Sequence, residues 1–187
     1  MQTHTSTRNV HRHRGLTFIE LLVVISIIAI LISLTAPSLL RLIADNTLST
    51  QVNTLLADTR FARSEATKRG GNVTICASAD ADAAAATCAG SDWKTGWIVF
   101  VDANGNDKRD ADEDILRRQE RFNGNYAITG AGGTTVAFWR FDAEGRIAGN
   151  PNGLAFTTTA GTARDRLLCV ASSGRVRLAA KEVTSCS

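Results

Sequence analysis

The feature that most constrains this chain is a long apolar run near its N-terminus with one carboxylate at its leading edge. The run extends from Leu21 to Leu34 without a charged residue, and Glu20 directly precedes it. About 20 apolar residues are enough to cross a bilayer as a helix. An ionisable group within such a segment costs free energy unless it has a partner. The run therefore predicts a membrane helix in which Glu20 requires an explanation.

Two ordinary kinds of membrane signal fit this run poorly. A secretory signal peptide has an apolar region of only about 7–15 residues, followed by a small-residue cleavage site, and no A-x-A-like site follows promptly here. A signal anchor fits the length but leaves Glu20 without an obvious partner in the segment. A third interpretation, an interfacial acid that reaches back to water and has no function, stays open.

The charge and histidine content limit the chemistry of the rest of the chain. Residues 1–15 contain Arg8, Arg12, Arg14 and all three histidines, and they contain no acid. Without these arginines, 18 basic residues remain against 18 acidic ones, so a basic surface must be local. If residues 1–15 are removed, no histidine remains in the chain. Ser-His-Asp catalysis and histidine-ligated metal sites are then nearly excluded. We therefore expect neither enzymatic activity nor a cofactor.

The pattern beyond the apolar run predicts an α+β fold. A helix from about Thr17 to Lys68 ends before Gly70 and Gly71, which give a C-cap signal. Short β segments between turn signals follow, and they predict two antiparallel sheets or a sandwich. The expected fold is a long N-terminal transmembrane helix whose C-terminal half packs against a globular antiparallel β domain. The helix stripe should comprise Leu48, Val52, Leu55, Thr59, Ala62 and Ala66. Strands are expected over 72–78, 96–102, 115–122, 134–142, 153–159, 166–172 and 174–179.

The four cysteines indicate disulfides rather than a zinc site, because no CxxC pair is present. Three connectivities are open. We favour Cys76–Cys88 and Cys169–Cys186, because each bond closes a short loop. Four free buried thiols are the alternative.

The segment from Gly15 to Glu20, followed by the apolar run, resembles the class III signal of type IV pilins and type II secretion pseudopilins. The resemblance implies that a prepilin peptidase cleaves between Gly15 and Leu16 and that Leu16 is then N-methylated. Most members have Phe where this chain has Leu16, which we treat as a minor departure. Glu20 would serve subunit assembly by meeting the N-terminal amine of a neighbouring subunit, since a paired charge is tolerable in low dielectric.

This resemblance also implies an organisation and a location. The expected parts are the leader, 1–15, the transmembrane and filament-core helix, 16–44, the amphipathic half of the same helix, 45–70, and the β-rich domain, 71–187. The chain would cross the inner membrane once, with its C-terminal domain in the periplasm. It would then join the pilus filament or its tip at the cell surface. Its partners would be other major and minor pilins and the prepilin peptidase.

The segments NVTICAS, WKTGWIVFVDANGN, RFDAEGR and LLCVASSGRVRL resemble the FimT/GspH family of minor pilins and pseudopilins. Gly174-Arg175-Val176-Arg177 is similar to a GRxR motif that FimT-type members use in DNA capture during natural transformation. In a strand, Arg175 and Arg177 would share a face about 7 Å apart, a spacing that suits neighbouring phosphates, and Lys181 lies just beyond. Weak, sequence-independent DNA binding is the favoured function. One alternative is an edge strand protected by arginines, and another is a GspH-like minor pseudopilin with a structural role in type II secretion.

The acidic loop from Asp102 to Glu113 is the remaining candidate site. Read as a calcium loop, it offers Asp102, Asn104, Asn106, Asp110 and Glu113 at positions 1, 3, 5, 9 and 12. However, Asp107 stands at position 6, where an EF-hand needs Gly. The favoured interpretation is an acidic hairpin turn in which Gly105 supplies a positive φ, so no metal site is expected and calcium is the alternative.

Overall fold

The computed structural model describes residues 15, 17–88, 90–124, 126–149, 151–158, 165–179 and 186. It divides into two compact units, Met1–Leu40 and Arg41–Ser187. The single α-helix of the described residues, α1, spans Phe18–Arg69 and belongs to both units. It ends one residue beyond the expected Lys68 because Gly70 takes a left-handed φ of 64° and the Gly71 amide donates to the Ala66 carbonyl.

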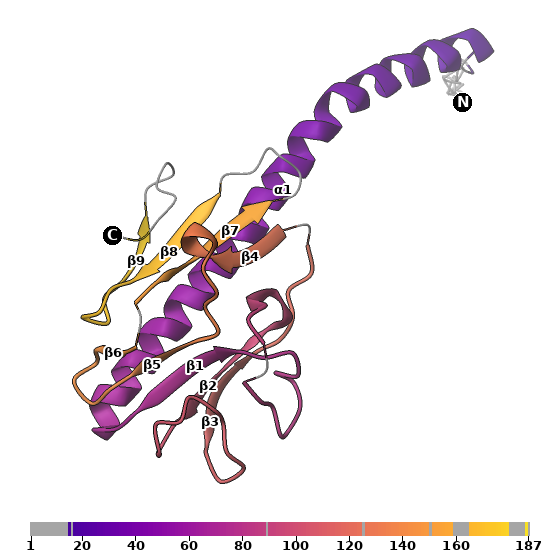
Figure 1. The fold of residues 1–187 in the computed structure, drawn as a ribbon. Helices are drawn as coiled ribbons and strands as arrows, with labels where there is room; N and C mark the ends of the chain where they lie inside the picture. Colours follow the sequence, from indigo (N-terminus) through magenta and orange to yellow (C-terminus); the bar gives the residue numbers. More distant parts are fainter. Residues whose placement is uncertain are drawn as a thin grey trace, which may run out of the picture. The chain divides into compact units, whose positions relative to one another are not determined.

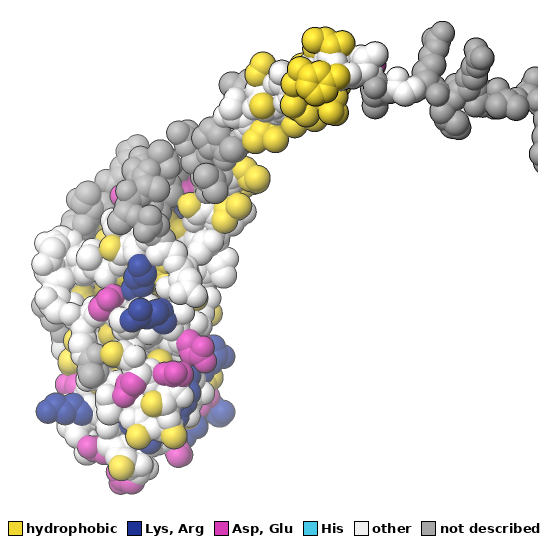
Figure 2. Space-filling view, turned by 90° about the vertical axis from the view of Figure 1, so that its right-hand side faces the viewer, with side chains coloured by type: hydrophobic (Ala, Val, Ile, Leu, Met, Phe, Trp, Pro, Cys, Tyr) yellow, Lys and Arg dark blue, Asp and Glu magenta, His cyan; other side chains and the backbone are white. Residues whose placement is uncertain are grey.

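The first unit is the N-terminal part of α1, and its apolar side chains are exposed. Phe18 is 77% exposed and Leu31 is 56% exposed, and hydrophobic side chains cover this part of the helix in Figure 2. Among the helices that the structure describes, none combines the length and apolarity needed to cross a membrane. The transmembrane role of residues 16–44 therefore stays a prediction.

In the second unit, α1 packs through the amphipathic stripe that its sequence predicts. All six stripe residues are at most 2% exposed. A helix with one apolar face gains most of its stability by burying that face against other elements. Leu48, Val52, Leu55, Ala62 and Ala66 join one hydrophobic core with residues of both sheets. The helix is therefore the common support of the β domain (Figure 1).

The β domain contains two antiparallel sheets (Figure 1). The first has the strand order β3-β2-β1-β5-β6, and the second has the order β4-β7-β8-β9. The first consists of β1 (Val73–Ala77), β2 (Trp97–Val101), β3 (Ile115–Gln119), β5 (Phe138–Phe141) and β6 (Ile147–Ala148). The second consists of β4 (Tyr126–Gly130), β7 (Gly153–Thr158), β8 (Arg166–Val170) and β9 (Val176–Ala179), and two short 3-10 helices, η1 (Trp93–Thr95) and η2 (Ala131–Gly133), complete the set.

The two-sheet α+β fold was predicted correctly, but individual strands differ from the expected ranges. The segment 134–142 forms a strand only over Phe138–Phe141. The Thr134 amide instead closes the 3-10 turn Ala131–Gly133, and the Val136 carbonyl accepts the Trp93 indole hydrogen. Two strands, β4 and β6, were not predicted. β6 has two residues, too few for a periodic signal, and β4 follows Gly124 and ends at Gly130, and both glycines are typical of loops.

The core lies between α1 and the two sheets. Its largest members are Trp93, Trp97 and Trp139, each at most 1% exposed. The ring centroids of Trp93 and Trp139 are 5.1 Å apart, within the range of favourable aromatic contacts. The Trp93 indole donates to the Val136 carbonyl at 2.6 Å, so this buried polar atom has a partner.

The opposite face of the first sheet is covered by the loop after β1. Cys76, Ile98 and Phe100 pack there with Ala81 and Ala86 of the loop. The structure contains the Cys76–Cys88 disulfide, which closes this loop, and also the Cys169–Cys186 disulfide. Burial on both faces explains why β2 is apolar along its length, with four of its five residues buried.

Candidate nucleic-acid interface

The Gly174-Arg175-Val176-Arg177 motif begins in the tight turn between β8 and β9. Gly174 has a left-handed φ of 73°, and its amide donates to the Ala171 carbonyl at 2.8 Å. The Ala171 amide donates to the Arg175 carbonyl at 3.0 Å, which brings Val170 opposite Val176 at the start of the strand pair. The exposed Arg175 is therefore the last residue of a closed turn, directly before β9.

This β8–β9 turn rests on the turn that joins β5 to β6. The Ile147 amide donates to the Ser172 carbonyl at 3.0 Å and so connects the two turns. Arg63 of α1 donates from Nε to the Gly145 carbonyl at 2.9 Å. A Cβ at Gly174 would collide with this same carbonyl and lie 3.1 Å from the Arg63 Nε. The glycine of the motif therefore permits close packing of the β8–β9 turn on both the β5–β6 turn and α1.

Asp142 organises the turn that supports the motif, within the RFDAEGR segment. Its Oδ1 accepts hydrogen bonds from the amides of Glu144 and Arg146, at 3.1 and 2.7 Å. The Gly145 amide donates to the Asp142 carbonyl at 2.9 Å, and Gly145 has a φ of 72°. An aspartate that binds the following amides is a common turn device. The RFDAEGR segment, one of those that resemble the family, therefore forms the β5–β6 turn on which the β8–β9 turn rests.

The two arginines of the motif have different surroundings. Arg177 lies in β9 opposite Cys169, and its neighbour Val176 is buried in the main core. Because side chains alternate along a strand, Arg177 belongs to the other face of the sheet from Val176. Arg175 precedes the strand, so this alternation does not extend to it. The prediction that the two arginines share a face requires a strand that includes both of them, but β9 begins only at Val176.

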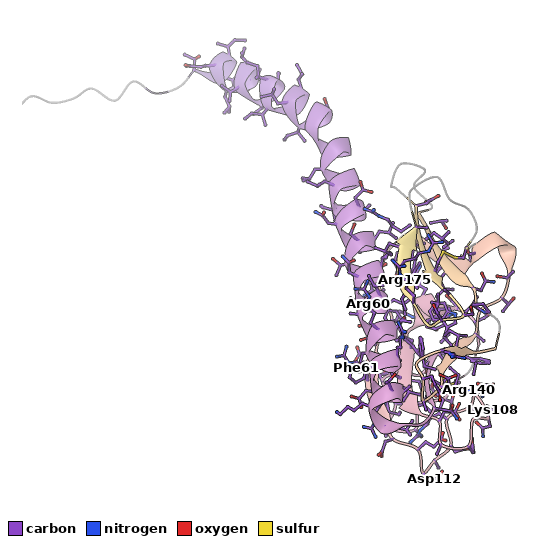
Figure 3. All side chains as sticks on the ribbon, turned by 90° about the vertical axis from the view of Figure 1, so that its left-hand side faces the viewer. Arg60, Phe61, Lys108, Asp112, Arg140 and Arg175 are labelled. Carbon is purple, nitrogen blue, oxygen red and sulfur yellow. A yellow bond between two sulfur atoms is a disulfide. The ribbon has the colours of Figure 1, made fainter. Side chains whose placement is uncertain are left out.

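Arg175 instead lines a groove with the C-terminal half of α1. Figure 3 shows Arg175 beside Arg60 of the helix. Among the described residues, the lining includes Arg60, Arg63, Lys68 and Arg175, and it does not include Arg177. The third predicted basic residue, Lys181, lies outside the described residues. The helical members were not predicted from the sequence, although Arg60 and Lys68 lie off the apolar stripe of α1.

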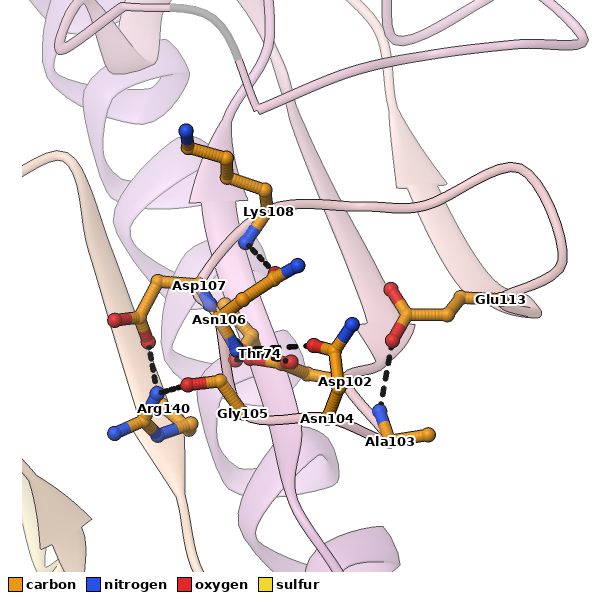
Figure 4. A network of polar contacts seen from close by, with 10 residues as sticks. All are labelled: Thr74, Asp102, Ala103, Asn104, Gly105, Asn106, Asp107, Lys108, Glu113 and Arg140. Carbon is orange, nitrogen blue, oxygen red and sulfur yellow. Dashed lines mark hydrogen bonds and ion pairs between the residues drawn. The ribbon is translucent and has the colours of Figure 1, made fainter.

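The acidic loop between β2 and β3 is held by its own hydrogen bonds (Figure 4). The fully buried Asp102 accepts bonds from the Thr74 hydroxyl at 2.9 Å and from the amides of Asn106 and Asp107 at 3.0 and 3.1 Å. Glu113 accepts from the amides of Ala103 and Asp110, at 2.8 and 3.0 Å. These carboxylates thus face hydrogen-bond donors, which a cation would have to replace.

The other candidate calcium ligands are used in the same way. Asn104 and Asn106 each donate from the side-chain amide to Asp110, at 2.8 and 2.9 Å. Their side-chain oxygens accept from the amides two residues further on, at 3.1 and 2.8 Å. Among the residues that the structure describes, no group of three or more acidic, histidine or cysteine side chains has a metal-binding arrangement. The loop has the geometry of an Asx-rich turn.

Arg140 connects this loop to the first sheet. It donates to the Gly105 carbonyl and pairs with Asp107 at 2.7 Å. Burial raises the pKa of Asp107, the Arg140 charge opposes this shift, and the Asp102 charge adds to it. Asp107 has a φ of 65°, the only positive φ of a non-glycine residue in the described part of the chain. The loop is therefore a hydrogen-bonded polar element at one end of the first sheet.

Glu20 lies at the start of α1, where it forms a capping box with Thr17. The Glu20 amide donates to the Thr17 hydroxyl at 3.3 Å, and the Glu20 carboxylate accepts from the Thr17 amide at 3.5 Å. This reciprocal pair satisfies two amides that the first turn of a helix leaves unpaired. The Thr-x-x-Glu spacing was the sequence signal for it. Gly15 is exposed, and Leu16 lies outside the described residues.

A long helix with an exposed apolar N-terminal part, whose C-terminal half supports antiparallel sheets, is the architecture of type IV pilin-like proteins. Residues 51–174 match the family described as type II transport protein GspH, and residues 10–36 match the prokaryotic N-terminal methylation motif. The chain belongs to the GspH family of minor type IV pilins and pseudopilins. The GspH match ends at Gly174, so it includes neither Arg175 nor Arg177.

Solved structures with a similar fold come from both branches of this class. The type IV minor pilin FimU of Pseudomonas aeruginosa is 24% identical, with 74% of this chain and 92% of that chain covered and a TM-score of 0.57. The minor pseudopilin EpsH of the type 2 secretion system of Vibrio cholerae is 11% identical, with 72% and 98% covered and a TM-score of 0.50. No curated protein sequence matches the chain. These similarities concern the fold.

Proposed function

We propose that the protein is a FimT-like minor type IV pilin that captures DNA through its C-terminal hairpin and contributes to DNA uptake in natural transformation. The observation that carries the proposal is the position of Arg175. It is exposed in a turn that Gly174 fixes against two other elements, and Arg177 follows in the edge strand β9. Such pre-positioned arginines suit phosphate groups, which guanidinium binds with favourable geometry.

The expected DNA binding is weak and independent of sequence. Arginine contacts to phosphates position a nucleic acid but carry no base information. Two or three contacts, from Arg175, Arg177 and Lys181, give a log–log salt slope of about −2 to −3. Useful capture would then depend on several subunits or on the high local concentration of DNA at a filament.

The test is fluorescence anisotropy of labelled duplex DNA with the full chain in detergent micelles, across a salt series. Arg175→Gln/Arg177→Gln should abolish the salt-sensitive binding. Lys108→Gln/Arg121→Gln removes two positive charges from exposed residues outside the hairpin, so it is the matched control. If the wild-type protein fails to bind at low salt, DNA capture by the single chain is refuted. If binding survives the double substitution, the site lies elsewhere.

The maturation proposed for the chain follows the pilin pattern and is supported by the methylation-motif match at residues 10–36. The prepilin peptidase would cleave between Gly15 and Leu16, Leu16 would be N-methylated, and Glu20 would contact the new amine of a neighbouring subunit. Before assembly the chain would cross the inner membrane once. Mass spectrometry of the purified protein should show Leu16 as a methylated N-terminus, and Glu20→Ala should reduce incorporation into filaments without preventing cleavage.

The alternative function is a structural role as a minor pseudopilin in type II secretion. The description of the matching family, type II transport protein GspH, favours this alternative. A deletion strain separates the two functions. Loss of DNA uptake with normal protein secretion supports the pilin, whereas loss of secretion with normal piliation and DNA uptake supports the pseudopilin.

A further inference from the structure

The groove beside Arg175 has two walls of different origin. One wall is the β8–β9 turn with Gly174 and Arg175, and the other is the C-terminal half of α1 (Figure 3). Arg60, Ser64 and Lys68 of α1 line this second wall at steps of four residues, which places them on one face of the helix. The groove volume of about 790 Å³ lies within the range of ligand sites, about 300–1,000 Å³.

The lining is strongly basic on a chain whose remainder is neutral. Four cations, Arg60, Arg63, Lys68 and Arg175, face one carboxylate, Glu144. Arg60 and Arg175 are both exposed, and within the described part of the chain neither guanidinium has a hydrogen bond or an ion pair. Both are therefore available to an external anion.

Most other arginines of the β domain are already used by the protein. Arg117 pairs with Asp58 at 2.7 Å, and Arg140 pairs with Asp107 at 2.7 Å. Arg118 donates to three loop carbonyls, those of Ala81, Ala83 and Ala84. An arginine whose donors are satisfied gains less from a phosphate. The two available guanidinium groups that meet at this groove differ from these structural arginines.

The remaining cations of the groove have intermediate roles. Lys68 pairs with Glu65 at 3.3 Å, but its side chain is 76% exposed, and such surface pairs are weak. Hydrogen bonding to Arg69, supported by Lys68, lowers the pKa of Glu65 against an opposing effect of burial. Arg63 is half-buried and bound to the Gly145 carbonyl, so it positions the β8–β9 turn.

We propose that α1 adds a second set of contacts to the DNA that the hairpin captures. Arg60, and Lys68 two turns further along the helix, would bind phosphates of the backbone that Arg175 holds from the other wall. This inference rests on the DNA-binding function proposed above and extends it from the hairpin to the helix. Arg60 and Lys68 are separated by about 12 Å along the helix axis. Measured along the axis of a duplex parallel to α1, that distance corresponds to about three or four phosphates of one strand, at an axial rise of about 3.4 Å each.

The side chains that line the groove favour contact with the DNA backbone over contact with the bases. Its described residues include no aromatic side chain on which an unstacked base could stack. Ser64 and Thr67 add hydroxyl groups, which commonly bind phosphate oxygens. Duplex DNA presents its phosphates with the bases already stacked inside, so it is the suitable probe.

The experiment measures the anisotropy of a labelled duplex with the full chain in detergent micelles, for wild type, Arg60→Gln, Arg175→Gln and the double variant. Each single change should weaken binding about three- to tenfold near 0.1 M salt and reduce the magnitude of the salt slope by about 0.9. The double variant should combine the losses of the two single variants, both in affinity and in the magnitude of the salt slope. Arg121→Gln serves as the charge-matched control, and thermal unfolding verifies that each variant is folded.

The outcomes separate this inference from the function on which it rests. If Arg175→Gln weakens binding while Arg60→Gln behaves like Arg121→Gln, DNA capture stands and the helical wall is refuted. If wild type does not bind the duplex at low salt, the proposed function itself fails. If Arg60→Gln weakens binding but leaves the salt slope unchanged, Arg60 acts on the fold rather than on phosphates, and the inference is overturned.

Discussion

Gly174 of the β8–β9 turn packs against the backbone carbonyl of Gly145 in the β5–β6 turn, with no room for a Cβ between them. The same carbonyl accepts the hydrogen bond from Arg63 of α1. One backbone oxygen thus joins the turns of two different sheets to the helix. The position of Arg175 follows from this packing, because Arg175 is the next residue of the turn.

Gly174→Ala should destabilise the protein by about 2–4 kcal/mol. A left-handed φ costs a non-glycine residue roughly 1–2 kcal/mol, and the collision with the Gly145 carbonyl adds to this cost. Gly132→Ala is the matched control, because Gly132 has a φ of 65° but nothing lies within 4 Å of the position that its Cβ would take. Denaturant unfolding should give the larger loss for Gly174→Ala. Equal losses would show that steric contact at Gly174 is unimportant.

Asp58→Ala should lower the free energy of unfolding by about 2–3 kcal/mol. Asp58 is 6% exposed and accepts the indole hydrogen of the fully buried Trp97 at 2.9 Å, so its removal leaves a buried donor unpaired. Arg117→Gln, which removes the other partner of Asp58, should cost about 1 kcal/mol or less, because the Arg117 side chain is 43% exposed. Denaturant unfolding of both variants measures the difference, and a reversed order would contradict this assignment.

Protonation of Asp80 should make the protein less stable in acid. The Thr87 amide, opposed by burial and helped by the Ser78 hydroxyl, lowers the pKa of Asp80. A carboxyl group with a lowered pKa contributes stability above its ordinary pKa of about 4 and loses that contribution as the pH falls through the folded-state value. Asp80→Asn should therefore lower Tm at about pH 7 more than at about pH 2. An equal decrease at both values would exclude this role of the charge.

Calcium should leave the stability of the protein unchanged. The carboxylates of Asp102 and Glu113 already accept backbone amides, and the oxygens of Asn104 and Asn106 do the same. A cation would have to break these hydrogen bonds before it gained ligands. Tm measured by differential scanning fluorimetry should be the same in excess calcium and in EDTA. A rise of several degrees with calcium would show that the loop rearranges into a binding site.

The elements with strong periodicity could be predicted from the sequence, and those without it could not. The stripe from Leu48 to Ala66 repeats at helical spacing over five turns, and all of its predicted residues are buried. The favoured cysteine pairs are also the bonds of the structure, because short loops limit where each cysteine can reach. By contrast, β6 has two residues and exists only through its pairing with β5.

The candidate site likewise has one part that can be predicted from the sequence and another part that cannot. The basic motif at 174–177 is visible in the sequence, but its relation to Arg60 depends on contacts between residues more than 100 positions apart. The expectation of a common face for Arg175 and Arg177 applied strand alternation to a residue that the strand does not include. The start of a strand is decided by the turn, and here the turn is decided by its packing on Gly145.

The sequence by itself determined the class of this protein: the apolar run with its leading carboxylate, the amphipathic helix and the alternating β segments are local patterns set by covalent order. The tertiary structure decided which cations are available and where they meet. Arg117 and Arg140 are bound to buried or half-buried carboxylates, whereas Arg60 and Arg175 are left unpaired, within the described residues, at one groove. Pairing of charges depends on distances of a few ångströms between separate elements, which only the packed fold establishes.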